Sequence, residues 1–249
     1  VNLELALGSL LVLVHGVISL WYRTGIANPV IIAACRMLIQ LGIMAYVLQF
    51  LFKSQSGFLT ALAVLFMLVF AGFEILNRQK RKIKGVWGYG IGLSSLVCAA
   101  SIVMGFALIF QLNADPWYNA RYLIPLLGMV LGNTMTGISI GFANLSSTLK
   151  NEGASIQARL ALGFTKWKAC EGLIRQSLHM GMIGIVNNMS AAGLVFIPGM
   201  MTGQLMAGAE TIEAAKYQAM IMFFIAGSTA IGTTIAVFFA IWRLTGKQH

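Results

Sequence analysis

The sequence predicts an all-α protein, a polytopic membrane helix bundle of about seven transmembrane helices. Its 249 residues are 58% hydrophobic and only 10% charged, whereas a soluble domain carries about 25% charged residues. The apolar residues fall in long runs separated by short polar loops. Each run is close to the roughly 20 residues that span a bilayer as a helix. We therefore expect a single transmembrane domain over residues 1–249, surrounded by lipid as a multi-pass protein of the cell (inner or plasma) membrane.

Basic and turn-forming residues mark the ends of the first four apolar runs. Arg23 closes the first run, Pro29 opens the second, and Lys53 closes the second. The third run ends in the most basic stretch of the chain, residues 78–84, and residues 113–116 turn the chain after the fourth. These limits predict spans over about residues 5–22, 30–52, 58–76 and 87–112.

The second half of the chain contains a long polar interruption and a broken helix. The fifth run starts near Arg121 and continues to the polar segment 150–175, and the sixth run is stopped by Pro198 and Gly199. Residues 198–209 then form a stretch rich in methionine and glycine, which predicts either a short re-entrant segment or a structural turn. These limits predict spans over about residues 121–149, 178–197 and 217–242.

The positive charges fall almost entirely on one side of the predicted bundle. The formal net charge is +10, from 17 Lys and Arg against 7 Asp and Glu. An outside N-terminus places thirteen basic residues on the inner side and three on the outer side, so the positive-inside rule predicts an N-out/C-in topology. The charge thus reflects topology, and we expect no nucleic-acid partner. The thirteen inner residues are Arg23, Arg78, Lys80, Arg81, Lys82, Lys84, Lys150, Arg159, Lys166, Lys168, Arg175, Arg243 and Lys247.

The sequence lacks the motif that binds a nucleotide phosphate. A P-loop has the pattern GxxxxGK[ST], and the lone pair Gly246 and Lys247 lacks both the first glycine and the Ser or Thr that should follow. The three histidines and three cysteines have no ligand-like spacing, and we expect the cysteines to be free thiols. We therefore predict that this chain is not an enzyme and holds no cofactor, and that ATP and Mg²⁺ bind in a partner subunit.

Polar side chains inside the predicted spans mark a candidate translocation path. Each must be hydrogen-bonded in hydrocarbon, so they either join helices to one another or line a path for the substrate, and both uses stay open. Methionines likewise bind soft cations or provide adaptable packing. The path candidates are Asn133, Thr136, Asn187, Asn188, Met200 and Met201.

Small residues four apart predict that the fifth and seventh spans are packed closely against other helices. Such pairs let helix backbones approach where lipid offers no hydrophobic drive. The pairs are Gly128 with Gly132, Gly137 with Gly141, and Ser228 with Gly232.

The polar segment 150–175 predicts a helix, a turn centred on Gly163 and a second helix. Its apolar residues alternate with polar and basic ones, and the charge count places it in the cytoplasm as a coupling helix between the fifth and sixth spans. A short amphipathic, basic segment there needs a protein partner, and we expect that partner to be an ATPase. The expected coupling residues are Ile156, Gln157, Ala158, Arg159, Leu160, Gly163, Phe164 and Trp167.

Several stretches resemble the FetB family of ATP-binding-cassette (ABC) transporter permeases, and the resemblance covers about residues 5–245. It implies a permease subunit that forms a homodimer and works with two copies of a separate cytoplasmic ATPase (FetA in the bacterial pair). It also implies iron export, and plant relatives are linked to aluminium tolerance. The stretches are LALGFTKWKA at 160–169, PGMMTG at 198–203, KYQ at 216–218, Arg36 with 40–48, and 128–135.

The function predicted from the sequence is therefore that of an ABC permease subunit moving iron by alternating access. The loop matches the general coupling pattern EAA-xxx-G only in part, since Gln157, Ala158 and Arg159 stand before Gly163. Three other interpretations stay open: an import permease for an amino acid or osmolyte, an ATPase-independent channel or ion-coupled carrier, and a structural membrane subunit. The scarcity of acids within the spans counts against ion coupling.

Overall fold

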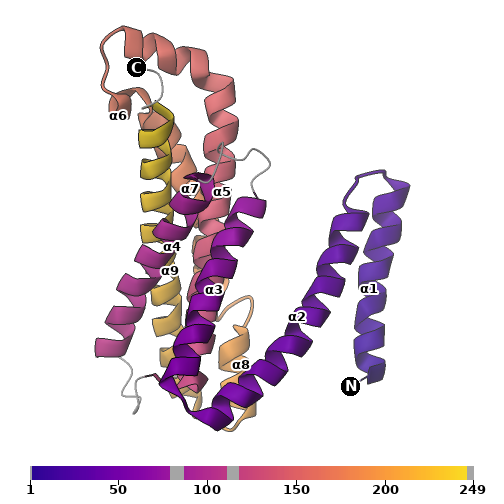
Figure 1. Ribbon diagram of the computed structural model, residues 1–249. Coiled ribbons are helices and arrows are strands. Elements are labelled where there is room, and N and C mark those ends of the chain that lie inside the picture. The colour runs from indigo at the N-terminus through magenta and orange to yellow at the C-terminus, as the bar shows by residue number, and fades with distance from the viewer. Residues whose placement is uncertain (1, 79–86, 111–117, 246–249) are drawn as a thin grey trace. The chain divides into compact units, whose positions relative to one another are not determined.

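The computed structural model describes residues 2–78, 87–110 and 118–245, which form α-helices and the turns between them (Figure 1). The basic residues 79–84, the predicted turn at 113–116 and the residues from 246 onward lie outside this description. The chain divides into two compact units, residues 1–56 and residues 57–249. The single transmembrane domain stays a prediction.

The first unit is a hairpin of two apolar helices, α1 (Asn2–Trp21) and α2 (Ala27–Ser54), which pack against each other. The Thr24 amide donates to the carbonyl of Ser19, and Gly25 adopts a φ of +72°, so the chain reverses within a few residues. Most large apolar side chains of both helices are exposed. This surface suits lipid or another membrane protein.

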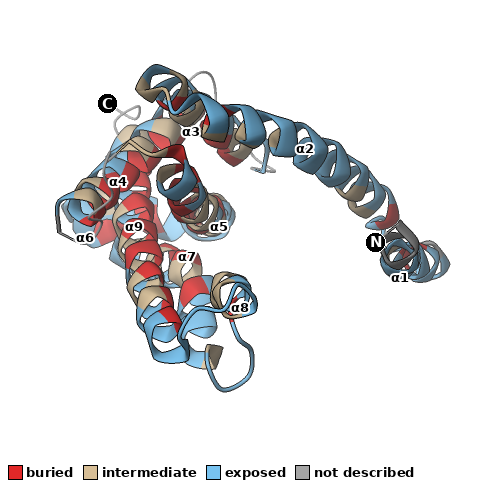
Figure 2. Ribbon diagram, turned by 90° about the horizontal axis from the view of Figure 1, so that it is seen from below, coloured by how far each residue is buried: buried red, intermediate tan, exposed pale blue. Residues whose placement is uncertain are grey.

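The second unit is a bundle centred on α5 and α9. The helix α9 packs against α4, α5, α7 and α8, while α5 also packs against α3. Figure 2 shows the buried residues of this unit concentrated where α4, α5, α7 and α9 face one another. The helices are α3 (Gly57–Asn77), α4 (Trp87–Phe110), α5 (Ala120–Ala161), α6 (Lys166–Ala169), α7 (Glu171–Ala191), α8 (Gly199–Met206) and α9 (Thr211–Thr245).

Five helices of the described chain are long and apolar enough to cross a membrane: α2, α3, α4, α5 and α9. The helix α1 contains a shorter apolar segment, Leu7–Ser19, and α7 is not among the five. No strand occurs among the described residues, which contain one isolated bridge between Ala192 and Phe196. The all-α, polytopic membrane class is thereby confirmed, while the number seven and the N-out/C-in orientation stay predictions.

Two helices extend well beyond their predicted spans. The fifth predicted span ends near 149, but α5 continues without a break to Ala161. Likewise α9 begins at Thr211 rather than near 217. In both cases most of the extra residues are polar or small, so hydropathy ends the span while nothing in the sequence breaks the helix. Span limits and helix limits are therefore different quantities in this chain.

The sixth predicted span, 178–197, is shifted in the structure, where α7 begins at Glu171 and ends at Ala191. Gly193 has a φ of +83° and donates its amide to the Phe196 carbonyl, which reverses the chain within the apolar run. Pro198 was predicted to stop this span, but it caps the N-terminus of α8 instead. The helix α8 packs against α9, and whether 198–209 re-enters the membrane stays a prediction.

Glycines bring the backbones of α5 and α7 into contact and let threonine side chains of α9 pack against them. A Cβ built on Gly137 of α5 would lie 2.9 Å from the Gly181 carbonyl oxygen of α7 and 2.6 Å from Cγ2 of Thr229 of α9. A Cβ on Gly232 of α9 would lie 2.6 Å from Cγ2 of Thr134. The predicted close packing of the fifth and seventh spans is confirmed at these positions, although Gly132 has no such neighbour.

Candidate functional site

The predicted coupling segment, residues 150–175, begins as the projecting C-terminal end of α5. This helix has 42 residues, about twice the number that crosses the hydrocarbon layer, so part of it must lie outside that layer. The polar residues 150–161 supply that part. Figure 1 shows the last turns of α5 bending across the end of the bundle toward α6. The predicted separate coupling helix is thus the end of a membrane helix.

A glycine turn joins α5 to the short helix α6. Gly163 adopts a φ of +86° and donates its amide to the Leu160 carbonyl, while Phe164 donates to the Arg159 carbonyl. Thr165 then caps α6, since its Oγ1 accepts from the Lys168 amide at 3.4 Å. The predicted order of helix, glycine-centred turn and second helix is confirmed.

The segment is anchored to the bundle by α6. The ring of Trp167 lies 5.2 Å, centroid to centroid, from that of Phe238 near the C-terminal end of α9. Ala169 and Cys170 are buried beside it, and burial raises the pKa of the Cys170 thiol. The segment and the C-terminal end of α9 therefore lie at the same end of the bundle, as the predicted topology requires.

The predicted coupling residues divide into buried and exposed ones. Ile156 is buried and Leu160 half-buried, so both hold the segment together rather than offering a surface. Gln157, Ala158, Arg159, Gly163, Phe164 and Trp167 are exposed.

Leu162 is the residue that the sequence reasoning missed. Its side chain is 78% exposed at the tip of the turn. The residue lies outside the predicted span, so contact with lipid would not stabilise its exposed apolar side chain. The signal available in the sequence was a leucine directly before the turn glycine, in a polar segment.

Some polar residues inside the bundle join helices to one another. The Thr134 hydroxyl on α5 donates to the Ser228 hydroxyl on α9 at 2.8 Å, and both side chains are fully buried. Ser177 on α7 donates to Oδ1 of Asn144 on α5 at 3.2 Å. These contacts are interhelical hydrogen bonds of the kind that fixes a membrane bundle.

Asn133 and Thr136 are bonded differently. Asn133 Nδ2 donates to the Met129 carbonyl, and Thr136 Oγ1 donates to the Gly132 carbonyl, both at 2.8 Å and both within α5. Asn133 is half-buried and Thr136 exposed. Each side chain therefore donates one proton to its own helix and keeps an oxygen atom that can accept from a neighbour or a substrate.

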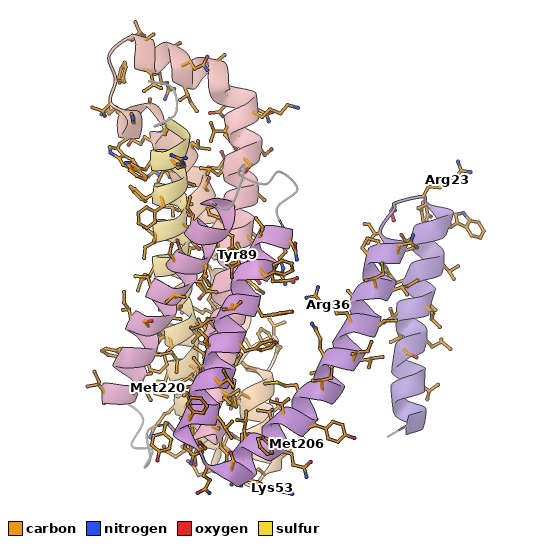
Figure 3. All side chains as sticks on the ribbon, in the orientation of Figure 1. Arg23, Arg36, Lys53, Tyr89, Met206 and Met220 are labelled. Atoms are coloured by element: carbon orange, nitrogen blue, oxygen red, sulfur yellow. The ribbon has the colours of Figure 1, made fainter. Side chains whose placement is uncertain are left out.

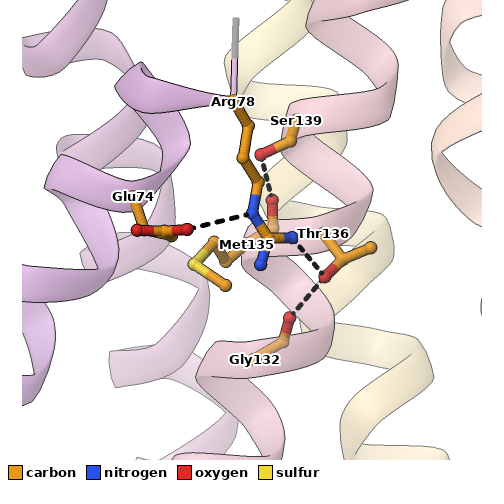
Figure 4. Close-up of polar contacts among 6 residues, drawn as sticks. All are labelled: Glu74, Arg78, Gly132, Met135, Thr136 and Ser139. Carbon is orange, nitrogen blue, oxygen red and sulfur yellow. Dashed lines mark hydrogen bonds and ion pairs between the residues drawn. The ribbon is translucent and has the colours of Figure 1, made fainter. Parts of the chain in front are cut away.

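A charged pair formed by Glu74 of α3 and Arg78, directly after this helix, contacts α5 at Thr136 (Figure 4). Nε of Arg78 lies 3.6 Å from Oε1 of Glu74, one turn earlier on the same chain. Nη1 of Arg78 donates to Thr136 Oγ1 at 3.3 Å. The Glu74 side chain is 18% exposed and that of Arg78 is 42% exposed. The guanidinium thus bridges a carboxylate on α3 and a hydroxyl on α5.

The remaining path candidates lie on α7 and α8. Asn187 and Asn188 are exposed on α7, whereas Met200 and Met201 are half-buried on α8, where Met200 packs against the core. Among the neighbouring methionines, Met220 of α9 also packs against the core, while Met206 is 86% exposed (Figure 3). The described residues contain no group of three or more His, Cys, Asp or Glu that could hold a metal ion. The role of these candidates in a path stays a prediction.

Comparison with known proteins finds one family across nearly the whole chain. The profile of the uncharacterised protein family UPF0014 matches residues 2–244. No solved structure matches.

Curated relatives include bacterial and plant proteins. The probable iron export permease protein FetB of Escherichia coli is 31% identical over 100% of this chain and 93% of its own length. The UPF0014 membrane protein YjkA of Bacillus subtilis is 33% identical over 94% of this chain and 91% of its own. The protein ALUMINUM SENSITIVE 3 of Arabidopsis thaliana is 28% identical over 91% of this chain and 81% of its own.

Proposed function

The chain belongs to the UPF0014 family of membrane proteins, and we propose that it is the membrane-spanning permease subunit of an ABC exporter. A FetA-like cytoplasmic ATPase would drive it between inward-open and outward-open states, and two copies of the chain would enclose the path. The cargo proposed is iron, because the relative from Escherichia coli is named as an iron export permease.

The main support for the proposal is the structure of the coupling segment, residues 150–175. The chain extends a membrane helix beyond the length a bilayer needs and follows it with a turn at which Leu162 and Phe164 are exposed. Exposed apolar side chains on a projecting turn suit a docking contact with a protein partner. Because the sequence has no P-loop of its own, an ATPase is the partner that would give this contact a purpose.

Motion at the segment would reach the bundle through two routes. One is α5 itself, which is continuous from the docking end to the polar face at Thr136. The other is the Trp167–Phe238 contact, which joins α6 to α9 and hence to α4, α7 and α8. Both central helices would therefore move with the ATPase, as alternating access requires.

The test is co-purification of the chain with a co-expressed FetA-type ATPase, followed by iron transport in proteoliposomes. Leu162→Asp should abolish ATPase binding without unfolding the chain, since the side chain is 78% exposed. The matched control is Leu194→Asp, at a leucine that is 92% exposed beyond the other end of α7, where ATPase binding should be retained.

Two results would contradict the proposal. One is iron transport by the chain alone, without nucleotide. The other is a Leu162→Asp variant that binds the ATPase as tightly as the unmodified chain.

A further inference from the structure

We propose that Glu74, Thr136 and Asn133 form a transit site for a divalent metal cation, with Arg78 occupying the cation position between passages. This inference rests on the proposed function and adds to it the place where the cargo is held. It begins from the seven acidic residues of the chain. One of them, Glu74, lies within the apolar helix α3, and its partner Arg78 contacts Thr136 of α5, where these two helices pack together.

The side chains of Thr136 and Asn133 on α5 each keep an acceptor oxygen. Thr136 gives its proton to Gly132, so its Oγ1 acts there as an acceptor, and it accepts from Arg78. Asn133 donates one amide proton to the Met129 carbonyl, and its Oδ1 keeps its capacity to accept or to bind a cation. With the Glu74 carboxylate these are hard oxygen ligands of the kind that Mn²⁺ and similar divalent cations prefer.

The Arg78 guanidinium is already held as a cation by two of these groups. It lies 3.6 Å from the Glu74 carboxylate and 3.3 Å from Thr136 Oγ1. Charge-assisted N–H···O bonds are usually about 2.7–2.9 Å long, so this pair is loose. An arriving metal ion can take the carboxylate, and the returning guanidinium can displace the ion.

The donor set fits passage rather than storage. A resident metal site needs several charged ligands, and no group of three or more His, Cys, Asp or Glu exists among the described residues. One carboxylate with neutral oxygens and water binds more weakly. A transport site has to bind its ion well enough to admit it and weakly enough to let it leave.

The experiment is Mn²⁺ titration of the detergent-solubilised full chain, alone and in complex with its ATPase, with free Mn²⁺ followed by electron paramagnetic resonance. Glu74→Gln should weaken Mn²⁺ binding at least about tenfold. Loss of a group that only supports a metal ligand typically weakens metal binding by about 10–100-fold, and Glu74 is proposed to be a ligand itself. Arg78→Gln should shift the Kd to lower Mn²⁺ concentration, because it removes the competitor and keeps the ligands. Thr136→Val, which changes shape little, should weaken binding in a folded protein.

The matched control is Glu213→Gln, at the exposed ion pair in which Lys216 Nζ lies 2.7 Å from the Glu213 carboxylate. It removes a paired carboxylate of the same kind and should leave Mn²⁺ binding unchanged.

A merely structural ion pair predicts a different pattern. Glu74→Gln and Arg78→Gln would then lower the melting temperature together, and neither would change the affinity for Mn²⁺. Absence of Mn²⁺ binding by the unmodified complex, or unchanged binding by Glu74→Gln or by folded Thr136→Val, overturns the inference.

The two proposals fail separately. ATP-driven transport with Mn²⁺ binding unaffected by Glu74→Gln overturns the transit site and keeps the permease. Loss of Mn²⁺ binding in Glu74→Gln, in a chain that never binds an ATPase, overturns the permease and keeps the cation site.

Discussion

Replacing Gly181 by Ala should force α7 away from α5 and α9. The added Cβ would lie 2.6 Å from Cγ2 of Thr233 and 2.9 Å from the carbonyl oxygen of Gly137. Ordinary contacts of a Cβ start near 3.4 Å, and the carbonyl is backbone, so it cannot rotate away. The helices must therefore separate by several tenths of an ångström, at a site where both neighbours are central to the bundle.

Gly184 on the same helix offers the matched control. Its Cβ would meet nothing within 4 Å, so Gly184→Ala shares the gain in helix propensity, about 0.5–1 kcal/mol, without the collision. Overpacking costs about 1–3 kcal/mol, and this is the expected difference in unfolding free energy between the two variants. For a unit of this size, about 2–4 °C per kcal/mol makes Gly181→Ala melt at least about 2 °C below Gly184→Ala.

The assay is thermal unfolding of the two variants in the same detergent, followed by the loss of the monodisperse peak in size exclusion. Equal melting temperatures would refute the reasoning, because they would mean that α7 can move aside without loss of packing. A lower melting temperature for Gly184→Ala would place the close contact at Gly184 rather than at Gly181.

Three further predictions concern the segment and the bundle. Trp167→Ala should leave ATPase binding and ATP hydrolysis in place but reduce transport, because it removes the ring contact with Phe238, and paired hydrolysis and transport rates in proteoliposomes check this. In a chain whose other cysteines are replaced by Ser, Cys170 should react with maleimide more slowly than a free thiol, and its reaction rate should begin to rise at a higher pH. The reason is that burial raises the pKa of Cys170 and the thiolate is the reactive form. The measurement is maleimide labelling over a pH series, and a pH dependence equal to that of a free thiol would contradict the prediction. Thr134→Val should lower the unfolding free energy by about 1 kcal/mol through loss of the bond to Ser228, measured as a shift in melting temperature.

Composition and hydropathy were sufficient to predict the class of fold, because lipid constrains a chain more strongly than water does. Apolar runs of spanning length can only be helices or barrels, and their length selects helices. The same rule fails at helix ends. The apolar residues 194–197 continue a hydrophobic run but follow Gly193, whose positive φ reverses the chain. Hydropathy does not register that single backbone angle.

Glycine spacing identified helices that pack closely without identifying their partners. Gly137 and Gly141 predicted a close approach by α5, and the structure supplies Gly181 of α7 and Thr233 of α9 as neighbours. A pair of small residues indicates that another helix can approach that face closely, but which helix does so depends on how all the helices are arranged. Long-range pairing of this kind is not encoded in a local pattern.

The polar residues show the same limit at the candidate site. Asn133 and Thr136 were candidates because they are polar residues within one predicted span, yet Thr136 is bonded to Arg78, directly after α3. The sequence shows Glu74 as an acid within an apolar run, but nothing local could show that its ion pair lies against α5. The chemistry of the pair appears only once two helices, remote in sequence, are side by side.

The helix α5 carries both proposed functions, and this gives them a common mechanism. Its docking end supplies Gln157 and Arg159, and its inner part supplies Thr136. The last turns of α5 bend (Figure 1), but the helix continues without a break to Thr136, and its proline, Pro125, lies on the other side of Thr136. A displacement of the docking end can therefore reach Thr136 through the helix. Glu74 belongs to α3, which has no part in the coupling segment. A pull on α5 would therefore move Thr136 relative to Glu74, and the distance between these two oxygen donors would change with each ATP cycle. On this proposal, a cation held between them would be released by the same movement that opens the path.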